Sequence, residues 1–518
     1  MDQESTAGFR DMKTSMTRSS LTGMVQSVIN AALVFVTIPS FIRILGAESY
    51  GVFSLVAIIG NVNTFANFGL NSSLVRFLAK QGKSDESDYD IIVTFIILLA
   101  ILVPLTVGAL VFQQDILVRI LGVNAEMMND AQWLFVSMLL GNALVLLGQT
   151  FTAILDSQQK IYLTNMFQMI YNFIYWSLIL VALWLNYALK GVAIATCAAS
   201  VIWFCMVALS SLISWKGISF RGLQKNGARV ARKQLSYGLK IYTAGVVGFF
   251  HEPLTKILVS RLIGIPEVGL FDIGLRVRNQ VVGLVTKLLS PLYPAISQMS
   301  DPDKVRTLVH DVEQKTFLVV LPISIIVVLL AKTAANMVFH SHIDAISITV
   351  ASFVVVYLVC STTVLPIYLF LMAKGYPSRN ILLQSMNSIV NAVVLIIALP
   401  LLHYYAAVAA NMVAIFSTFL MLLVFQKKYL NSLIFDSTRQ VAKLLFATIL
   451  AFGIGYCSIS LATGDWWKLI SAPIVVLCVT IISYRQLEIV TFRDVRRYLG
   501  ERTPVSIFVT RVLCKTTS

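Results

Sequence analysis

The sequence predicts an all-α, polytopic membrane protein with about 14 transmembrane helices. Of its 518 residues, 57% are apolar and only 13% are charged, whereas soluble domains carry about 25% charged residues. The apolar residues gather in blocks of roughly 20 or more, the length that lets a helix cross a ~30 Å hydrocarbon layer. A short pattern that recurs in two of these blocks adds an internal duplication to this picture.

Hydropathy and the distribution of basic residues give the predicted spans and their orientation. We place the spans at 20–42, 51–78, 90–112, 131–154, 162–185, 190–213, 236–260, 268–290, 315–339, 346–372, 380–402, 405–426, 440–461 and 466–485. With both termini in the cytoplasm, most of the 40 Lys and Arg residues fall on the cytoplasmic side, as the positive-inside rule requires. The net charge of +15 is therefore mainly an orientation signal, and no nucleic-acid partner is expected.

The duplication is visible in two separate pairs of segments. RILGAESYGVF at 43–53 matches RLIGIPEVGLF at 261–271, and two asparagines further along match at nearly the same offset. The identical pairs are Arg43 with Arg261, Gly46 with Gly264, Gly51 with Gly269, Phe53 with Phe271, Asn165 with Asn380 and Asn172 with Asn387. Transporters often contain such repeats and move one against the other around a central cavity.

The duplication divides the chain into two pseudo-symmetric six-helix lobes and two additional C-terminal helices. We expect an N-lobe at 1–213, a basic cytoplasmic linker at 214–235, a C-lobe at 236–426, the extra helices at 427–486 and a basic cytoplasmic tail at 487–518. The linker is expected to contact anionic headgroups.

Ionisable residues inside the predicted spans mark a candidate site. The seventh span contains Lys240, His251, Glu252 and Lys256, and the eighth contains Asp272, Arg276, Arg278 and Lys287. An isolated charge at this depth costs at least about 2.5–3.5 kcal/mol, so such residues usually face a wet cavity or one another. Asp272, Arg276, Asn279, Gly283 and Lys287 recur at steps of three and four residues, which places them on one helix face.

Two interpretations of these charges remain open. The excess of positive charge favours an anionic headgroup bound by Arg276, Arg278, Lys287, Lys240 and Lys256, with Glu252, Asp272 or His251 coupling transport to an ion. Alternatively, Glu252 with Lys256 and Asp272 with Arg276 are intrahelical ion pairs that let their helices insert. Arg43 and Arg261, at the outer ends of their spans, either extend to headgroups or form a gate.

The sequence contains no motif typical of an ATPase, a metalloprotease, a hydrolase or a metal site. Walker A, HExxH and GxSxG patterns are absent, and the six cysteines show no metal-ligand spacing. We therefore expect no cofactor, no metal and no enzymatic activity. Short predicted external loops argue against the alternative of a membrane glycosyltransferase or ligase.

Three segments resemble a known family. IPSFIRILGAESYGVFSL at 38–55, FGLNSSLVRFLAK at 68–80 and LMAKGYPSRN at 371–380 are similar to signatures of bacterial polysaccharide exporters and O-antigen flippases of the multidrug/oligosaccharidyl-lipid/polysaccharide (MOP) superfamily. The resemblance implies a flippase of the bacterial inner membrane that moves an undecaprenyl-pyrophosphate-linked oligosaccharide to the outer leaflet, with polysaccharide-assembly proteins as partners. The alternative within the superfamily is an ion-coupled exporter of drugs or metabolites, whose members typically have twelve spans.

Overall fold

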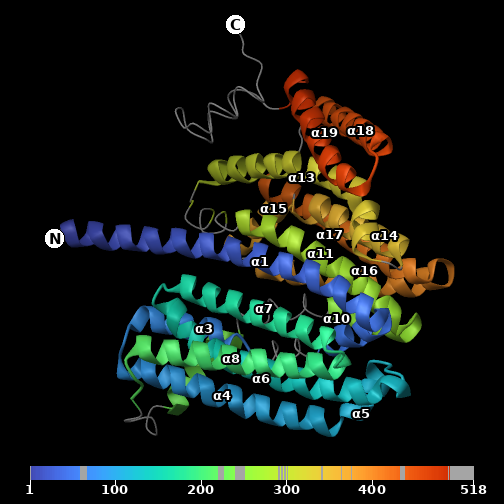
Figure 1. The fold of residues 1–518 in the computed structure, drawn as a ribbon. Helices are drawn as coiled ribbons and strands as arrows, with labels where there is room; N and C mark the ends of the chain where they lie inside the picture. Colours follow the sequence, from blue (N-terminus) through green and yellow to red (C-terminus); the bar gives the residue numbers. More distant parts are fainter. Residues whose placement is uncertain are drawn as a thin grey trace. The chain divides into compact units, whose positions relative to one another are not determined.

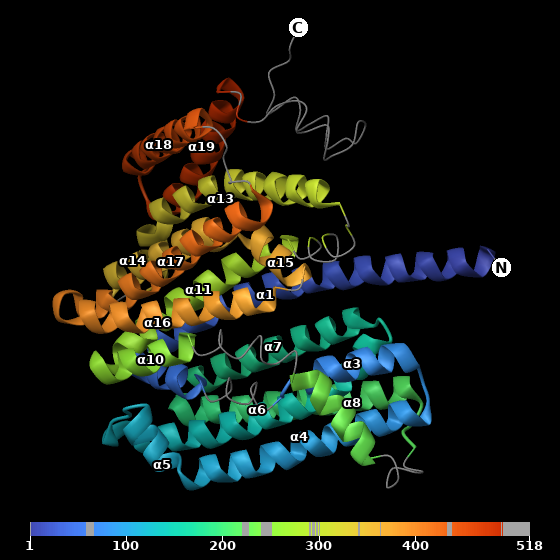
Figure 2. The same ribbon diagram turned by 180° about the vertical axis from the view of Figure 1, so that it is seen from behind.

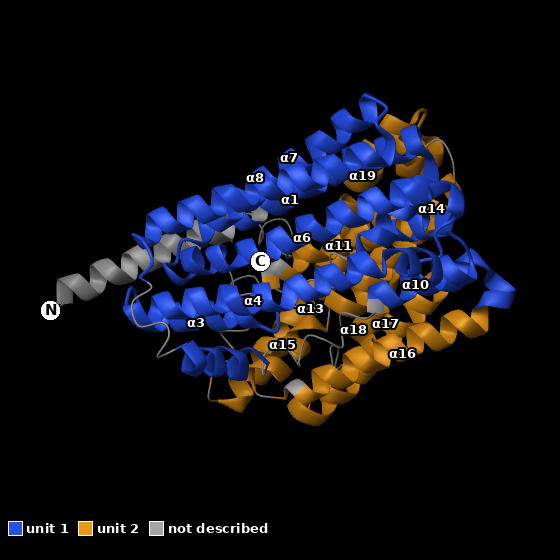
Figure 3. Ribbon diagram, turned by 90° about the horizontal axis from the view of Figure 1, so that it is seen from below, with its two compact units in different colours: residues 1–272, 399–407 blue, residues 273–398, 408–518 orange. Residues whose placement is uncertain are grey.

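The computed structural model describes most of the chain. It covers residues 2–58, 67–219, 227–239, 251–289, 292, 296, 299, 301–339, 342–362, 364–374, 376–431, 438–487 and 489. All regular elements in these ranges are helices, which confirms the predicted fold class (Figure 1). The helices form two compact units, residues 1–272 with 399–407, and residues 273–398 with 408–518 (Figure 3). The six-helix lobes of the duplication stay a prediction.

Unit 1 is built from long apolar helices. They are α1 (Asp2–Val56), α3 (Leu70–Gln81), α4 (Asp85–Val111), α5 (Gln113–Asp115), η1 (Ile116–Ile120), η2 (Ala125–Met127), α6 (Met128–Ser157), α7 (Ile161–Trp184), α8 (Ala188–Trp215), α10 (His251–Leu262) and the first turns of α11 (Ile265–Leu289). Helices α6, α7 and α8 lie side by side (Figure 2) and share a core of Leu155, Phe167, Trp203 and Val207.

Unit 2 continues with the remainder of α11 and eight further elements. These are α13 (Pro302–Val338), α14 (Ile343–Tyr357), η3 (Leu358–Thr362), α15 (Leu365–Ala373), most of α16 (Pro377–Leu402), most of α17 (Tyr404–Leu430), α18 (Thr438–Leu461) and α19 (Asp465–Gln486). Helix α13 packs against α14, α18 and α19. Its start follows from the sequence, because the Asp301 side chain accepts from the backbone N–H groups of Asp303 and Lys304 and Pro302 occupies the first turn.

Eleven of the described helical segments are long and apolar enough to cross a membrane, and each corresponds to one predicted span. The first segment, Val25–Val56, covers most of 20–42 and also the first residues of 51–78. The remaining predicted spans are 51–78, 236–260 and 268–290; the first two include 59–66 and 240–250, which lie outside the described residues. The eighth span is helix α11, which carries five charged residues. The protein is thus a multi-pass membrane protein.

Two predicted spans are interrupted. In the second, α1 ends at Val56 and α3 begins at Leu70 after a turn at 67–69, where Phe68 and Gly69 have φ angles of 43° and 70°. In the tenth, α14 passes through the π-helical segment η3 before α15 begins at Leu365. Hydropathy averaged over a whole span does not locate these breaks, because it carries no signal for a local change of backbone angle.

The exposed surface also fits a membrane. Large aliphatic side chains such as Ile213, Leu401 and Ile449 are 70–83% exposed, as expected where lipid replaces water. Exposed tryptophans, Trp133, Trp184, Trp466 and Trp467, lie at helix ends that the predicted topology places on the outer side. Tryptophan is enriched at this depth because its ring is apolar and its N–H is polar.

The first residues of the predicted linker are fixed to unit 1 by a buried carboxylate. Asp88 in the first turn of α4 accepts hydrogen bonds from Trp215 Nε1 (2.6 Å) and the backbone N–H of Ser219 (2.8 Å), and it forms an ion pair with Lys83 (2.7 Å). In the helical segment 227–239, Lys233 forms an ion pair with Asp90 at 2.9 Å. The linker is therefore tied to α4 at both described ends.

Candidate functional site

The two copies of the repeated pattern contact each other through their glycines. A Cβ atom on Gly51 would lie 2.1 Å from the carbonyl oxygen of Ile265, and one on Gly269 would lie 2.9 Å from that of Ala47. Such distances leave no room for a side chain, so the backbones of α1 and α11 touch at this point. Each copy of the pattern thus supplies one glycine to the same close approach.

Aromatic residues surround this contact. Phe41, Tyr50, Phe53 and Phe271 are at most 1% exposed. The ring of Phe41 lies 5.4 Å from that of Tyr50 and 5.2 Å from that of Phe53. Gly46 makes the turn between the two parts of α1, with a φ of 82° that a residue with a Cβ rarely adopts. The first copy of the pattern is thereby packed around the buried Tyr50 ring.

Beside the glycine contact lies a buried ion pair. Lys256 Nζ of α10 is 2.5 Å from Asp272 Oδ1 of α11, and Lys256 also donates to Ser54 Oγ at 3.0 Å. The Tyr50 hydroxyl donates to Asp272 Oδ2 at 2.6 Å. The side chains of Lys256 and Asp272 are only 12% and 3% exposed. We call Tyr50, Ser54, Lys256 and Asp272 the inter-repeat network, because it joins the end of the first copy of the pattern to Asp272, the residue that follows the second copy.

The bond from Lys256 crosses to Asp272 of α11, a pairing that neither interpretation of the sequence included. The alternative of intrahelical ion pairs stays a prediction for Asp272 with Arg276. Sequence reasoning also missed Tyr50 and Ser54, although a signal existed. Extending the repeat alignment by one residue places Ser54 on Asp272. Both of these equivalent residues accept a hydrogen bond from Lys256.

The remaining cations of α11 lie in different surroundings. Arg278 is 4% exposed, its guanidinium lies 4.2 Å from the centre of the Tyr357 ring, and it donates to Asn279 Oδ1. Arg276 is half-buried. Further along the predicted polar face, Asn279 is exposed and a Cβ on Gly283 would meet no atom within 4 Å. Part of this face is therefore unpacked within the described structure.

Some predicted site residues cannot be placed. Lys240 lies outside the described residues, and so do the side chains of His251 and Lys287, whose backbones belong to α10 and α11. Glu252 is half-buried. Their roles stay predictions.

The two repeated arginines have unequal positions. Arg43 is exposed, whereas Arg261 donates to the carbonyl oxygens of Val118 (2.6 Å) and Ile120 (3.1 Å) in η1. The neighbouring Ser260 hydroxyl donates to the carbonyl of Leu121. Arg261 thus ties the end of α10 to the segment that follows α4.

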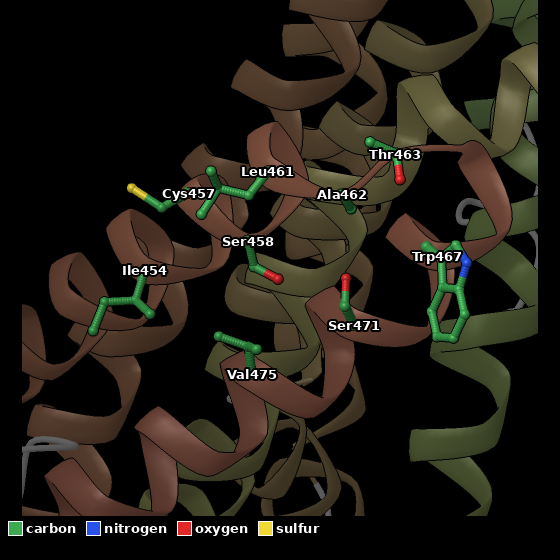
Figure 4. A pocket seen from close by; sticks show the side chains of 9 residues that line it. All are labelled: Ile454, Cys457, Ser458, Leu461, Ala462, Thr463, Trp467, Ser471 and Val475. Atoms are coloured by element: carbon green, nitrogen blue, oxygen red, sulfur yellow. The ribbon is translucent and has the colours of Figure 1, made fainter.

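An open groove of about 570 Å³ lies between α18 and α19 in unit 2 (Figure 4). Its lining includes Ile454, Leu461, Trp467 and Val475, and none of its nine residues is charged. Such a surface suits a lipid chain and carries no positive charge to attract an anion.

Comparison with known proteins identifies the chain. A family model described as "polysaccharide biosynthesis protein" matches residues 41–348. No curated protein matches. The structure is similar to lipid II flippase MurJ in an inward closed conformation, with a TM-score of 0.61, 15% identity and coverage of 92% of this chain and 99% of that one.

Two transporters of the MOP superfamily share the fold as well. An inward-facing multidrug resistance MATE family transporter has a TM-score of 0.60 and 16% identity over 79% of this chain and 99% of that one. A transporter from Pyrococcus furiosus has a TM-score of 0.51 and 16% identity over 81% and 97%. At these identities the likeness establishes the fold alone, whereas the family model covers more than half of the chain. The chain therefore belongs to the polysaccharide biosynthesis protein family, with the fold of the MOP superfamily.

Proposed function

We propose that the protein is a flippase that moves an undecaprenyl-pyrophosphate-linked oligosaccharide from the cytoplasmic to the outer leaflet of the bacterial inner membrane. The observation that carries this proposal is the inter-repeat network together with the glycine contact. Under the predicted topology, both lie at the outer end of the spans. An outer end held shut by contacts between repeats is what alternating access requires of a state open to the cytoplasm.

The anionic headgroup is proposed to bind along the polar face of α11. Arg276 is half-buried, and the face beyond it is unpacked at Gly283, which leaves space for a ligand. Arginine suits a pyrophosphate because its planar guanidinium donates two parallel hydrogen bonds to phosphate oxygens. We propose that Arg276, Arg278, Lys287 and Lys240 hold the headgroup.

Lys256 takes a different place in this scheme, because Asp272 already balances its charge. We propose that the Lys256–Asp272 pair opens when the outer end opens, and that it closes again after release. The polyprenyl chain stays in lipid throughout, through a lateral opening between the repeats. Proton or Na⁺ coupling through Glu252 or His251 remains part of the proposal.

The test replaces Arg276 and Lys287 by Ala and measures lipid-linked saccharide on the outer leaflet of cells or proteoliposomes. A loss of at least tenfold in flipping at normal expression is expected, since each substitution removes charge-assisted hydrogen bonds to phosphate. Lys332→Ala serves as the matched control, because Lys332 is an exposed cation paired with Asp344 at the end of α13. Normal flipping in the double variant eliminates the proposed headgroup site.

The likeness to MATE transporters favours a second candidate, an exporter of drugs or metabolites. A deletion strain separates the two. Accumulation of lipid-linked saccharide on the inner leaflet supports the flippase, and altered susceptibility to toxic compounds with intact surface polysaccharide supports the exporter.

A further inference from the structure

Unit 2 contains a buried carboxylate that the transport scheme does not use. Glu313 in α13 and Gln426 in α17 are both 0% exposed, and Gln426 Nε2 donates a hydrogen bond to Glu313 Oε2. The surrounding core is apolar and includes Val309, Leu422 and Phe425. Glutamate is almost never fully buried unless it is paired, so this position needs an explanation.

The contact between Glu313 and Gln426 leaves one oxygen of each side chain without a hydrogen bond. Glu313 Oε1 and Gln426 Oε1 are both buried without a hydrogen-bond partner. Both atoms are acceptors when the glutamate is ionised, so neither can provide the hydrogen bond that the other lacks. A proton on Glu313 Oε1 turns that oxygen into a donor, and the amide oxygen of Gln426 is the natural acceptor. One proton therefore satisfies both atoms.

We propose that Glu313 is a proton-binding site. The neutral acid and the amide then form a ring of two hydrogen bonds, from Gln426 Nε2 to Glu313 Oε2 and from Glu313 Oε1 to Gln426 Oε1. The step transfers one proton from hydronium in the solvent to a carboxylate lone pair, leaves one water molecule behind, and changes the charge of the Glu313 side chain from −1 to 0.

The surroundings favour a proton over other ligands. Within the described residues, the hydrogen bond from Gln426 is the one polar contact of the carboxylate, and no cation pairs with it. In the part of the chain that the structure describes, no group of three or more His, Cys, Asp and Glu residues gathers to hold a metal ion. An ionised carboxylate in such a place has lost its hydration with little compensation.

The described titratable side chains on α13, α15, α17 and α19 do not bond to the Glu313 carboxylate. His310 of α13 hydrogen-bonds to Gln314, and Tyr484 of α19 donates to the carbonyl of Leu318. Lys315 of α13, Tyr368 of α15 and Tyr429 of α17 make no hydrogen bond or ion pair with the carboxylate. The protonation of Glu313 is therefore governed by burial and by Gln426.

The place of the pair along the chain connects it with transport, a step that rests on the proposed function. Gln426 directly precedes Lys427 and Lys428 in the last turn of α17, at the end of the span that the predicted topology places in the cytoplasm. Separation of α13 from α17 at this end exposes the acid to water and releases its proton. Proton release is thereby linked to one conformation of unit 2.

Infrared spectroscopy of the purified full-length protein tests the site directly. The wild type is expected to show the carbonyl stretch of a protonated carboxylic acid at neutral pH, and Glu313→Gln is expected to lose it. Asp303→Asn, at an exposed position of the same helix, must keep the band. Identical wild-type and Glu313→Gln spectra in this region overturn the proposal.

A second variant protects the test against misfolding of the first. Gln426→Leu removes the amide and is expected to shift the acid band to higher frequency, because a carbonyl that loses its hydrogen bond stiffens. A band that does not move overturns the ring. In proteoliposomes, a pH gradient should accelerate wild-type flipping of the lipid-linked saccharide and leave Glu313→Gln unaffected. An equal response of both proteins overturns the coupling role, whereas no flipping by the wild type refutes only the proposed function.

Discussion

Removal of the carboxylate at position 272 gives the sharpest test of the inter-repeat network. In Asp272→Asn the shape of the side chain is kept and the Tyr50 hydroxyl still has an oxygen to donate to. Lys256, however, loses its counter-charge while its side chain remains only 12% exposed. Its remaining hydrogen bond goes to Ser54 Oγ, a neutral group.

The magnitude follows from the burial of both partners. Breaking a buried ion pair by removing one member destabilises a protein by about 3–5 kcal/mol, whereas replacing both charges by neutral groups is often nearly neutral. Asp272→Asn is therefore expected to lower the free energy of unfolding by about 3–5 kcal/mol, which is a hundredfold or more in the folding equilibrium. The double variant Lys256→Met, Asp272→Asn is expected to recover most of that loss.

Equilibrium unfolding in mixed detergent micelles measures both effects, and the double-mutant cycle isolates the pairwise energy. The same variants can be compared by accessibility of a cysteine at position 54 to a membrane-impermeant thiol reagent. The reagent should react faster in Asp272→Asn because the outer end opens more often. A loss below about 1 kcal/mol, typical of an exposed pair, refutes the claim that this network is buried and holds the repeats together.

Further predictions concern packing and hydrogen bonds. Gly51→Ala places a methyl group against the Ile265 carbonyl and should destabilise by about 1–3 kcal/mol, while Gly108→Ala, which meets no atom within 4 Å, should be neutral or stabilising; equal thermal stability of the two variants contradicts the close approach. Trp215→Phe removes the donor to Asp88 and should cost about 1.5–3 kcal/mol in thermal unfolding. Trp184→Phe, at an 81% exposed position, should change the stability by no more than about 0.5 kcal/mol. An equal loss of stability in both variants would contradict the importance of the Trp215 hydrogen bond.

Much of the fold was predictable because the bilayer imposes a simple rule. Every backbone polar group must be satisfied within its segment, so long apolar runs form helices. That rule located eleven spans that the structure confirms. It could not locate the breaks at Phe68–Gly69 and at η3, because hydropathy records the burial of side chains and carries no signal for a local change of backbone angle.

The candidate site was predictable only as a set of residues. Charges in apolar spans singled out Lys256 and Asp272, and the repeated pattern singled out Gly51 and Gly269. Their partners could not be predicted, because Lys256 has carboxylates within reach both on its own helix and on the next. Glu313 gave no sequence signal, since it lies at the polar border of a span where a solvated carboxylate is ordinary.

By itself, the sequence determined that this chain spans a membrane repeatedly and that two of its segments are related copies, since both follow from composition and order along one dimension. Only the tertiary structure decided that these copies meet backbone to backbone and that Lys256 neutralises Asp272. It also decided that the Glu313 carboxylate is buried and accepts a hydrogen bond from Gln426. The physical reason is that ion pairing and desolvation act over a few ångströms in space, and only helix packing brings residues of different helices within that range.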